Sequence, residues 1–208
     1  MNLLKTFLIY LTTVLFIACS NGDKASIVGA DFGDASFIND NFAGNKINYE
    51  KIGNPCELLN SIQIAKLYGA SSEKVMIDRS NELGGQKSCR FLVSLSDQEF
   101  DHLTGFIAIA PEISADNDPG GIAEATGGGT EWIEAWELKK MLSKSSEYIP
   151  NMGKAAIWFG AKRSLLIKLD GYSLSITAPG AAFNKKEKEK NRNYKAIAIE
   201  IAQKSGLL

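Results

Sequence analysis

The sequence predicts an α+β domain, in which helices cover one face of an antiparallel sheet in the order α-βββ-α-βββ-α. Three observations lead to this fold class. Apolar residues recur at helical spacing in three segments, and short strand-like runs separate those segments. Asp170-Gly171 lies between two runs of alternating hydrophobicity, which is the pattern of a tight β-hairpin. The hydrophobic content of 45% is that of a globular protein with a core.

The N-terminus has the pattern of a secretion signal. Lys5 adds a positive charge beside the α-amino group, and an apolar run from Phe7 to Ala18 follows it. This run of about 12 residues is shorter than the ~20 that a membrane-spanning helix needs. It fits the apolar part of a cleaved signal, so residues 1–18 are assigned to a signal peptide.

The signal ends at a cysteine. Residues 15–19 read Leu-Phe-Ile-Ala-Cys, which resembles the lipobox of bacterial lipoproteins. That resemblance implies that Cys19 becomes the first residue of the mature protein and carries acyl chains, which anchor it stably to a membrane. Ser20 resembles the sorting pattern for the outer membrane, so the expected location is the cell envelope, at the outer membrane and facing the periplasm. The alternative is an ordinary cleaved signal followed by a free thiol.

The segment after the signal is rich in Gly, Asp, Asn and Ser and has no long periodic run. Residues 19–50 are therefore predicted to form a flexible tether, and residues 51–208 a single domain. The formal net charge of −1 offers no general attraction to nucleic acid, so no nucleic-acid partner is expected.

Two cysteines remain once Cys19 is assigned to the lipid. Cys56 and Cys89 are expected to form a disulfide, because the envelope is an oxidising compartment. The alternative is a pair of buried free thiols. A zinc site needs four ligands and His102 is the only histidine, so no metal is expected.

The first helix is predicted to open at Asn54, because Pro55 suits the first helical position and Glu57 completes a capping box. Gly69 ends it after Tyr68, as a C-terminal glycine commonly does. Three short strands are expected next, over Lys74–Asp78, Cys89–Leu95 and Thr104–Ala110.

A long mobile loop is predicted over residues 111–130, where glycine and polar residues dominate. Thr130 then suits the cap of a second helix, Glu131–Leu142. A strand is expected at Ala155–Phe159.

The segment Ser164–Ala178 gives the clearest local prediction, a hairpin that turns at Asp170-Gly171. In that register the apolar pairs share one side of the ribbon: Leu169 with Tyr172, Ile167 with Leu174, and Leu165 with Ile176. A closing amphipathic helix is predicted, with a charged start at Lys185–Arg192, an apolar stripe at Tyr194, Ile197, Ala198 and Ile201, and an end at Gly206.

Several short motifs follow one another in a defined order along the folded part of the chain. They are Pro55-Cys56-Glu57-Leu58-Leu59 at a helix start, Gly69 at its end, Cys89-Arg90-Phe91, the run from Ile149 to Trp158, Leu165–Ile176 and the closing helix. Together they resemble a class of small bacterial lipoprotein domains of unknown function, known from actinobacteria. The family tends to have an acidic residue where this chain has Lys154. The resemblance implies a lipid-anchored, disulfide-stapled envelope domain and supplies no catalytic residue.

Three tryptophans are the candidate ligand-binding residues, because aromatic side chains are enriched in binding surfaces and apolar pockets. Trp132 and Trp136 lie four residues apart on one helix face, and Trp158 lies in a predicted strand. The alternative is that all three are ordinary core residues. No cofactor motif is present in the sequence, so none is expected.

Function follows from location more than from any motif. The leading hypothesis is a non-enzymatic, lipid-anchored envelope protein that contacts the membrane through Cys19 and binds a protein partner or a small apolar ligand. One rival is an envelope hydrolase that uses paired carboxylates. Its candidate residues are Asp97, Glu99, Asp101, Glu131 and Glu134. A second rival is a purely structural surface lipoprotein.

Overall fold

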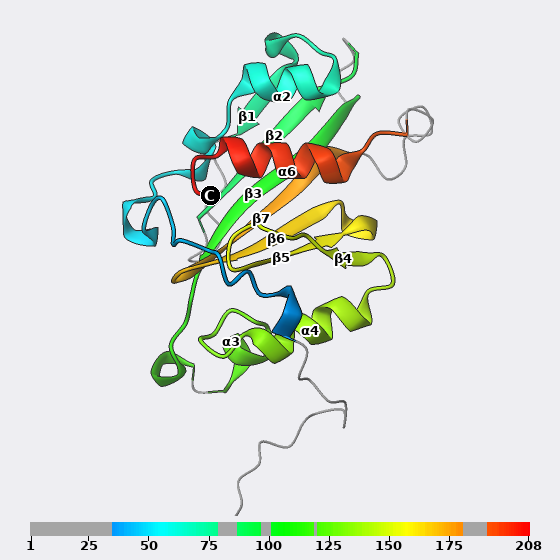
Figure 1. The fold of residues 1–208 in the computed structure, drawn as a ribbon. Coiled ribbons are helices and arrows are strands. Elements are labelled where there is room, and N and C mark those ends of the chain that lie inside the picture. The colour runs from blue at the N-terminus through cyan, green and yellow to red at the C-terminus, as the bar shows by residue number, and fades with distance from the viewer. Residues whose placement is uncertain (1–34, 79–86, 97–100, 119, 181–190) are drawn as a thin grey trace, which may run out of the picture. The chain divides into compact units, whose positions relative to one another are not determined.

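The computed structural model describes residues 35–78, 87–96, 101–118, 120–180 and 191–208. Seven strands form one antiparallel sheet in the order β1-β2-β3-β7-β6-β5-β4 (Figure 1). The strands are β1 (Val75–Asp78), β2 (Lys87–Ser94), β3 (His102–Pro111), β4 (Ser146–Tyr148), β5 (Ala155–Phe159), β6 (Ser164–Leu169) and β7 (Tyr172–Gly180).

Four α-helices are described: α2 (Ser61–Tyr68), α3 (Ile122–Ala125), α4 (Ile133–Leu142) and α6 (Tyr194–Lys204). Short 3-10 helices lie at Ala35–Phe37, Tyr49–Lys51, Pro55–Leu58, Ser72–Lys74, Ala115–Asn117 and Gly160–Lys162. The α+β class is confirmed, but the element order differs from the predicted one. The second half has a fourth strand, β4, and α3 precedes α4. β4 has only three residues, too few for a periodic pattern, and exists because it pairs with β5.

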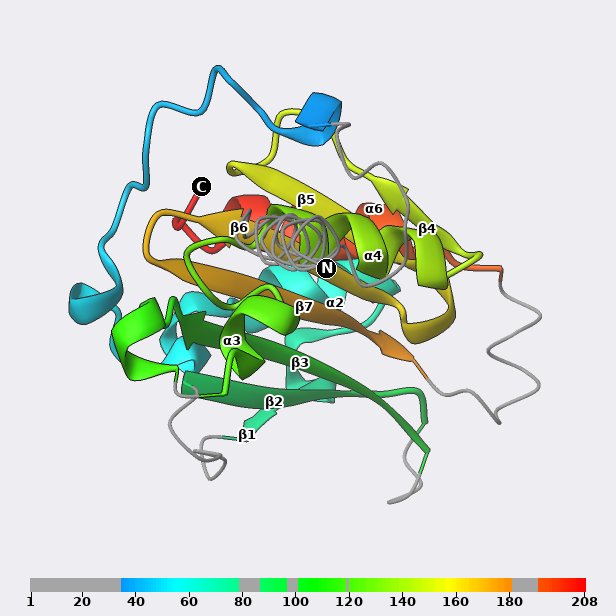
Figure 2. The ribbon, with the colours of Figure 1, turned by 90° about the horizontal axis from the view of Figure 1, so that it is seen from below.

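The sheet is covered on both faces rather than on one. α2 packs against β1, and α6 packs on β6 and β7 over the main core. On the opposite face, Trp132 and Trp136 from the α4 region pack against Ala155 and Ile157 of β5. Figure 2 shows α4 and α3 on the side away from α2. The Ala155–Phe159 strand is apolar throughout for this reason, because both of its faces are buried.

The first helix is interrupted. Asn54 caps only a 3-10 turn, where its side chain accepts a hydrogen bond from the Cys56 backbone N–H. Asn60 then accepts from the backbone N–H groups of Ile62 and Gln63 and starts α2 afresh. The second Asn cap therefore divides the helix expected from Asn54. Gly69 ends α2 in the left-handed conformation, at φ 65°, as predicted.

The hairpin register is confirmed at every predicted pair, from Leu169↔Tyr172 to Leu165↔Ile176. Cys56 and Cys89 form the expected disulfide, which joins the 3-10 turn before α2 to β2. The chain-entropy model values closure of a loop of this length at roughly 3–4 kcal/mol.

The described part of residues 111–130 is more ordered than predicted. Asp118 accepts hydrogen bonds from the backbone N–H groups of Ala123 and Glu124 at the start of α3. A parallel bridge joins Ile113 to Gly129 at the base of this segment. Thr130 does not cap α4, which begins at Ile133 without a side-chain cap.

Residues 35–50, which were expected to be a tether, pack on the domain, so the compact unit begins at Ala35 rather than at residue 51. Asn45 exchanges two hydrogen bonds with the backbone of Asp170, at 2.6 and 2.9 Å. The Asn39 backbone and side chain donate to the carbonyls of Lys154 and Gly153. Figure 2 shows this segment passing along the flank of the sheet. Its composition is loop-like because it is held to the domain by hydrogen bonds of asparagine side chains to backbone groups, and not by a periodic apolar face.

Tyr172 joins the same segment to the core. Its side chain is fully buried, and its hydroxyl donates to the Ile47 carbonyl at 2.9 Å. Burial, and secondarily the charge of Asp170, raises the pKa of Tyr172 to about 12.

We expect Tyr172→Phe to lower the free energy of unfolding at pH 7 by about 1 kcal/mol, because the Ile47 carbonyl loses its donor. The raised pKa stabilises the fold fully below pH ~10, and this contribution is lost as pH rises to about 12. Urea titrations from pH 8 to 12 should therefore show a steeper alkaline loss for the wild type than for the variant. Identical slopes would contradict a buried, hydrogen-bonded phenol.

Candidate functional site

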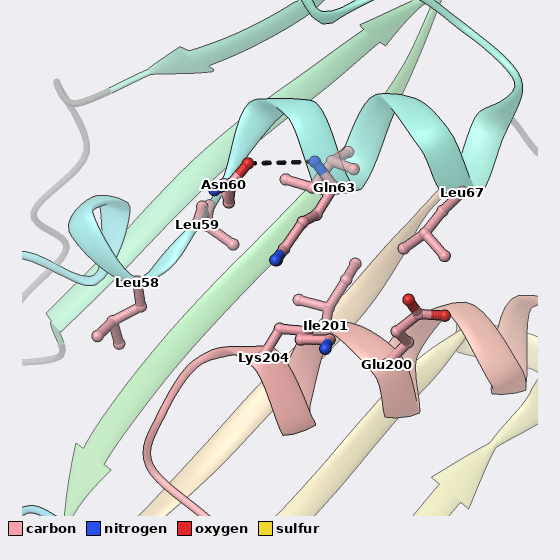
Figure 3. A pocket seen from close by; sticks show the side chains of 9 residues that line it. Leu58, Leu59, Asn60, Gln63, Leu67, Glu200, Ile201 and Lys204 are labelled. Atoms are coloured by element: carbon pink, nitrogen blue, oxygen red, sulfur yellow. Dashed lines mark hydrogen bonds between the residues drawn. The ribbon is translucent and has the colours of Figure 1, made fainter.

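A groove runs between α2 and α6 on the main-core side of the sheet (Figure 3). The two helices are antiparallel there, since the start of α2 faces Lys204 and its end faces Arg192. The lining residues come from both helices and from the turn before α2. They are Leu58, Leu59, Asn60, Gln63, Ile64, Leu67, Arg192, Asn193, Ala196, Ile197, Glu200, Ile201 and Lys204.

The groove has a narrow part and an open part, which meet at Leu67 and Glu200. The narrow part holds a cavity of about 10 Å³, enough for one water molecule. The open part, beside Ala196, has a volume of about 360 Å³. Buried Ile64, Ile197 and other apolar residues form the floor, while the charged side chains stand at the rim.

The groove has positively charged side chains at its two ends and a negatively charged one between them. Arg192 lies at one end and Lys204 at the other, with Glu200 between them. Arg192 is held in place, because it stacks 5.0 Å from the Tyr68 ring centre and donates to the Tyr68 carbonyl. The Tyr68 hydroxyl in turn donates to the Pro179 carbonyl at 2.8 Å, so this end of the groove is fixed to β7.

A second polar site lies on the opposite face of the sheet, beneath α4. Lys168 is fully buried and forms an ion pair with Glu112, just after β3. Its ammonium also lies 5.7 Å from the centre of the Trp132 ring. A fully buried lysine is uncommon unless it is paired, so this pair is a structural requirement of the α4 layer.

The glycine run before α4 packs against the indole of Trp136. The Trp136 indole N–H donates to the Gly127 carbonyl at 3.2 Å. A Cβ on Gly127 would come within 2.6 Å of that indole, and its φ of 70° also favours glycine. Lys139 donates to the neighbouring Thr126 carbonyl, and burial, with repulsion from Lys162 and Lys168, lowers its pKa.

The three tryptophans do not form one site. Trp132 and Trp136 pack edge to face with ring centres 5.2 Å apart on the α4 side. Trp158 belongs to the main core on the other face of the sheet. All three are at most 7% exposed, so none presents its ring to a ligand in this conformation.

The described carboxylates of the hydrolase hypothesis fall into two separate groups, because Glu131 and Glu134 lie three residues apart near the start of α4 and Asp101 lies elsewhere. Asp97 and Glu99 lie outside the described residues. Asp101 precedes β3, whereas Glu131 lies beside Glu124, past the opposite end of that strand. A ten-residue strand spans roughly 30 Å, too far for acid–base work on one bond. Within the described ranges, no group of three or more His, Cys, Asp or Glu side chains is arranged to hold a metal.

Sequence reasoning missed the groove and the buried ion pair. The uninterrupted apolar run at Ala155–Phe159 was the available signal that the sheet has a second covered face. The confirmed hairpin register places Lys168 on that face, so the two patterns taken together would have predicted its burial. The groove had no local signal, because it depends on how two helices distant in sequence pack together.

The chain matches no known protein family, no curated protein and no solved structure. The resemblance to the actinobacterial lipoprotein domain therefore remains a prediction, as does the lipobox at Cys19, which lies outside the described residues. Among the helices of the described ranges, none is long and apolar enough to cross a membrane.

Replacing Glu112 by Gln should lower the free energy of unfolding by about 3–5 kcal/mol, because it leaves Lys168 charged and buried without a counter-ion. Lys168→Met should cost less, since the Glu112 side chain is 22% exposed and keeps access to water. Urea denaturation of both variants measures the difference.

The exposed pair Lys195–Glu147 is the matched control, with its charged atoms 3.1 Å apart. Glu147→Gln should change the stability by less than about 1 kcal/mol. Equal changes in the free energy of unfolding for Glu112→Gln and Glu147→Gln would show that burial does not increase the contribution of the Lys168–Glu112 pair to stability.

Proposed function

We propose that this chain is a lipid-anchored cell-envelope protein without enzymatic activity, which binds a protein partner in the α2–α6 groove. The observation that supports it best is the form of the groove, an apolar floor with charged ends between two helices. The signal-like N-terminus and the lipobox at Cys19 support the envelope location, at the outer membrane and facing the periplasm. The Cys56–Cys89 disulfide is consistent with an oxidising compartment.

The shape of the groove favours a protein segment over a small apolar molecule. Sites for drug-sized molecules enclose ~300–1,000 Å³ and bury most of the ligand. Here the narrow part holds about 10 Å³, and the larger part is open and bordered by Arg192 and Glu200. A partner that lies along the groove would cover the apolar floor from outside without entering it.

The charges indicate what such a segment carries. α6 extends from Tyr194 to Lys204, which is roughly 15 Å at a helical rise of 1.5 Å per residue, and Arg192 lies two residues before its start. A helix of about 12 residues spans that length. The complementary partner is an amphipathic segment with an apolar stripe and an acidic side chain near each end.

Lipid anchoring is tested at Cys19. Mass spectrometry of the purified wild type should show a mature N-terminus at residue 19 that carries acyl chains. The Cys19→Ser variant should lack that mass and leave the membrane fraction. A wild-type chain that is cut elsewhere, or that has a free Cys19 thiol, would contradict the anchor.

The groove is tested by photo-crosslinking in the host envelope. A photoreactive amino acid at Gln63 or at Ala196, one on each helix and both exposed, should yield the same crosslinked protein. Lys204→Glu should reduce that yield several-fold, because it reverses one charged end.

Ala161 is the control position, since it is exposed but lies outside the groove. No crosslink from Gln63 and Ala196, or an equal yield from Ala161, would contradict a binding groove.

A further inference from the structure

Exposed apolar side chains are concentrated at one end of the molecule. The described residues include eight large hydrophobic side chains that are exposed, and five of them lie between residues 113 and 142: Ile113, Ile122, Ile133, Met141 and Leu142. Figure 1 places α3 and α4, which bear most of them, at the end of the ribbon opposite α2. Such a concentration in 30 residues marks an interaction surface rather than scattered exposure.

The outer side of α4 has an apolar edge at its C-terminal end. Trp136 points inward and is fully buried, whereas Met141 is 61% and Leu142 78% exposed. Leu138, one turn earlier, is half-buried on the same side of the helix. Unlike an ordinary surface helix, α4 is therefore apolar on both its inner and its outer side at this end.

Lysines lie near this apolar edge. Lys139 and Lys140 lie in the last turns of α4, and exposed Lys144 follows the helix. Lys162, from the 3-10 turn after β5, is close enough to Lys139 to repel it. The acidic residues on the outer side, Glu131 and Glu134, lie at the other end of the helix.

The chain enters the described unit next to this edge. The Phe37 ring stacks on Tyr148 with ring centres 4.4 Å apart, and it meets Trp132 edge to face at 6.2 Å. The ammonium of Lys140 lies 5.9 Å from the centre of the same Tyr148 ring. Sixteen residues, from Cys19 to Asp34, connect this point to the anchor, so the two are at most ~55 Å apart.

We propose that the C-terminal end of α4, with Leu138, Met141 and Leu142 and the lysines near them, docks on an anionic lipid bilayer. This inference rests on the proposed lipid anchor, which brings the surface to the membrane. Apolar side chains enter the headgroup region while the lysines bind anionic headgroups, as in other interfacial helices. α2, which borders the groove, lies at the opposite end of the ribbon and then faces away from the membrane, toward a partner.

The test uses the mature chain from residue 19 with Cys19→Ser, so that binding does not depend on acylation. Sedimentation with vesicles of phosphatidylethanolamine and phosphatidylglycerol at millimolar lipid should pellet the protein, and vesicles of phosphatidylcholine alone should not. The double variant Met141→Glu/Leu142→Glu should weaken binding at least tenfold. Both side chains are exposed, so circular dichroism should remain that of the parent chain.

Ile62→Glu and Met76→Glu are the matched controls, because these side chains are 69% and 56% exposed but lie on α2 and β1. Both controls should bind vesicles as the parent chain does. No binding to anionic vesicles, or equal binding by the α4 variant and the controls, would overturn the proposal and leave this surface to a protein. A failure of acylation at Cys19 is detected separately by mass spectrometry, so the two proposals fail independently.

Discussion

The antiparallel pairing of β3 with β7 unites the two halves of the sheet. β1, β2 and β3 form one meander, and β4 to β7 form the other, and β3–β7 is the one strand pair that joins them within the described residues. The pairing extends from Thr104↔Gly180 to Pro111↔Tyr172, with an irregularity beside Gly105. A Cβ on Gly105 would lie 2.7 Å from Phe91 and Pro179, so glycine is needed where the two meanders meet.

Both proposed surfaces depend on that pairing. α2 packs on the first meander and α6 on the second, so the groove between them exists only because β3 and β7 hold the meanders together. Glu112 immediately follows β3 and pairs with Lys168 of β6, which fixes the base of the α4 layer across the same junction. The groove is thus made from segments of chain that are distant in sequence, whereas the residues of the α4 surface are close in sequence and depend on the β3–β7 pairing only through the layer that supports them.

Local patterns predicted most elements, whereas the interactions between elements were beyond them. The Asp170-Gly171 hairpin was predicted in full because its turn chemistry and its alternation agree. The tether was mistaken because Asn39 and Asn45 bind backbone groups of distant residues, an interaction that leaves no periodic signal. The three tryptophans were predicted as candidate ligand-binding residues with a core alternative, and nothing local places Trp132 and Trp158 on opposite faces of one sheet.

The bonds between residues 35–50 and the domain also determine how the protein would bear tension on the proposed anchor. A pull applied ahead of Ala35 reaches the Phe37–Tyr148 stack first, then the Asn39 bonds and the paired bonds of Asn45 to the Asp170 turn. The Tyr172 bond to the Ile47 carbonyl follows them. Each of these attachments consists of one or a few weak interactions, whereas β5, β6 and β7 are held together by continuous ladders of backbone hydrogen bonds. Mechanical force would therefore lengthen the linker stepwise, by freeing residues 35–50, before it deformed the sheet or the helices packed on it.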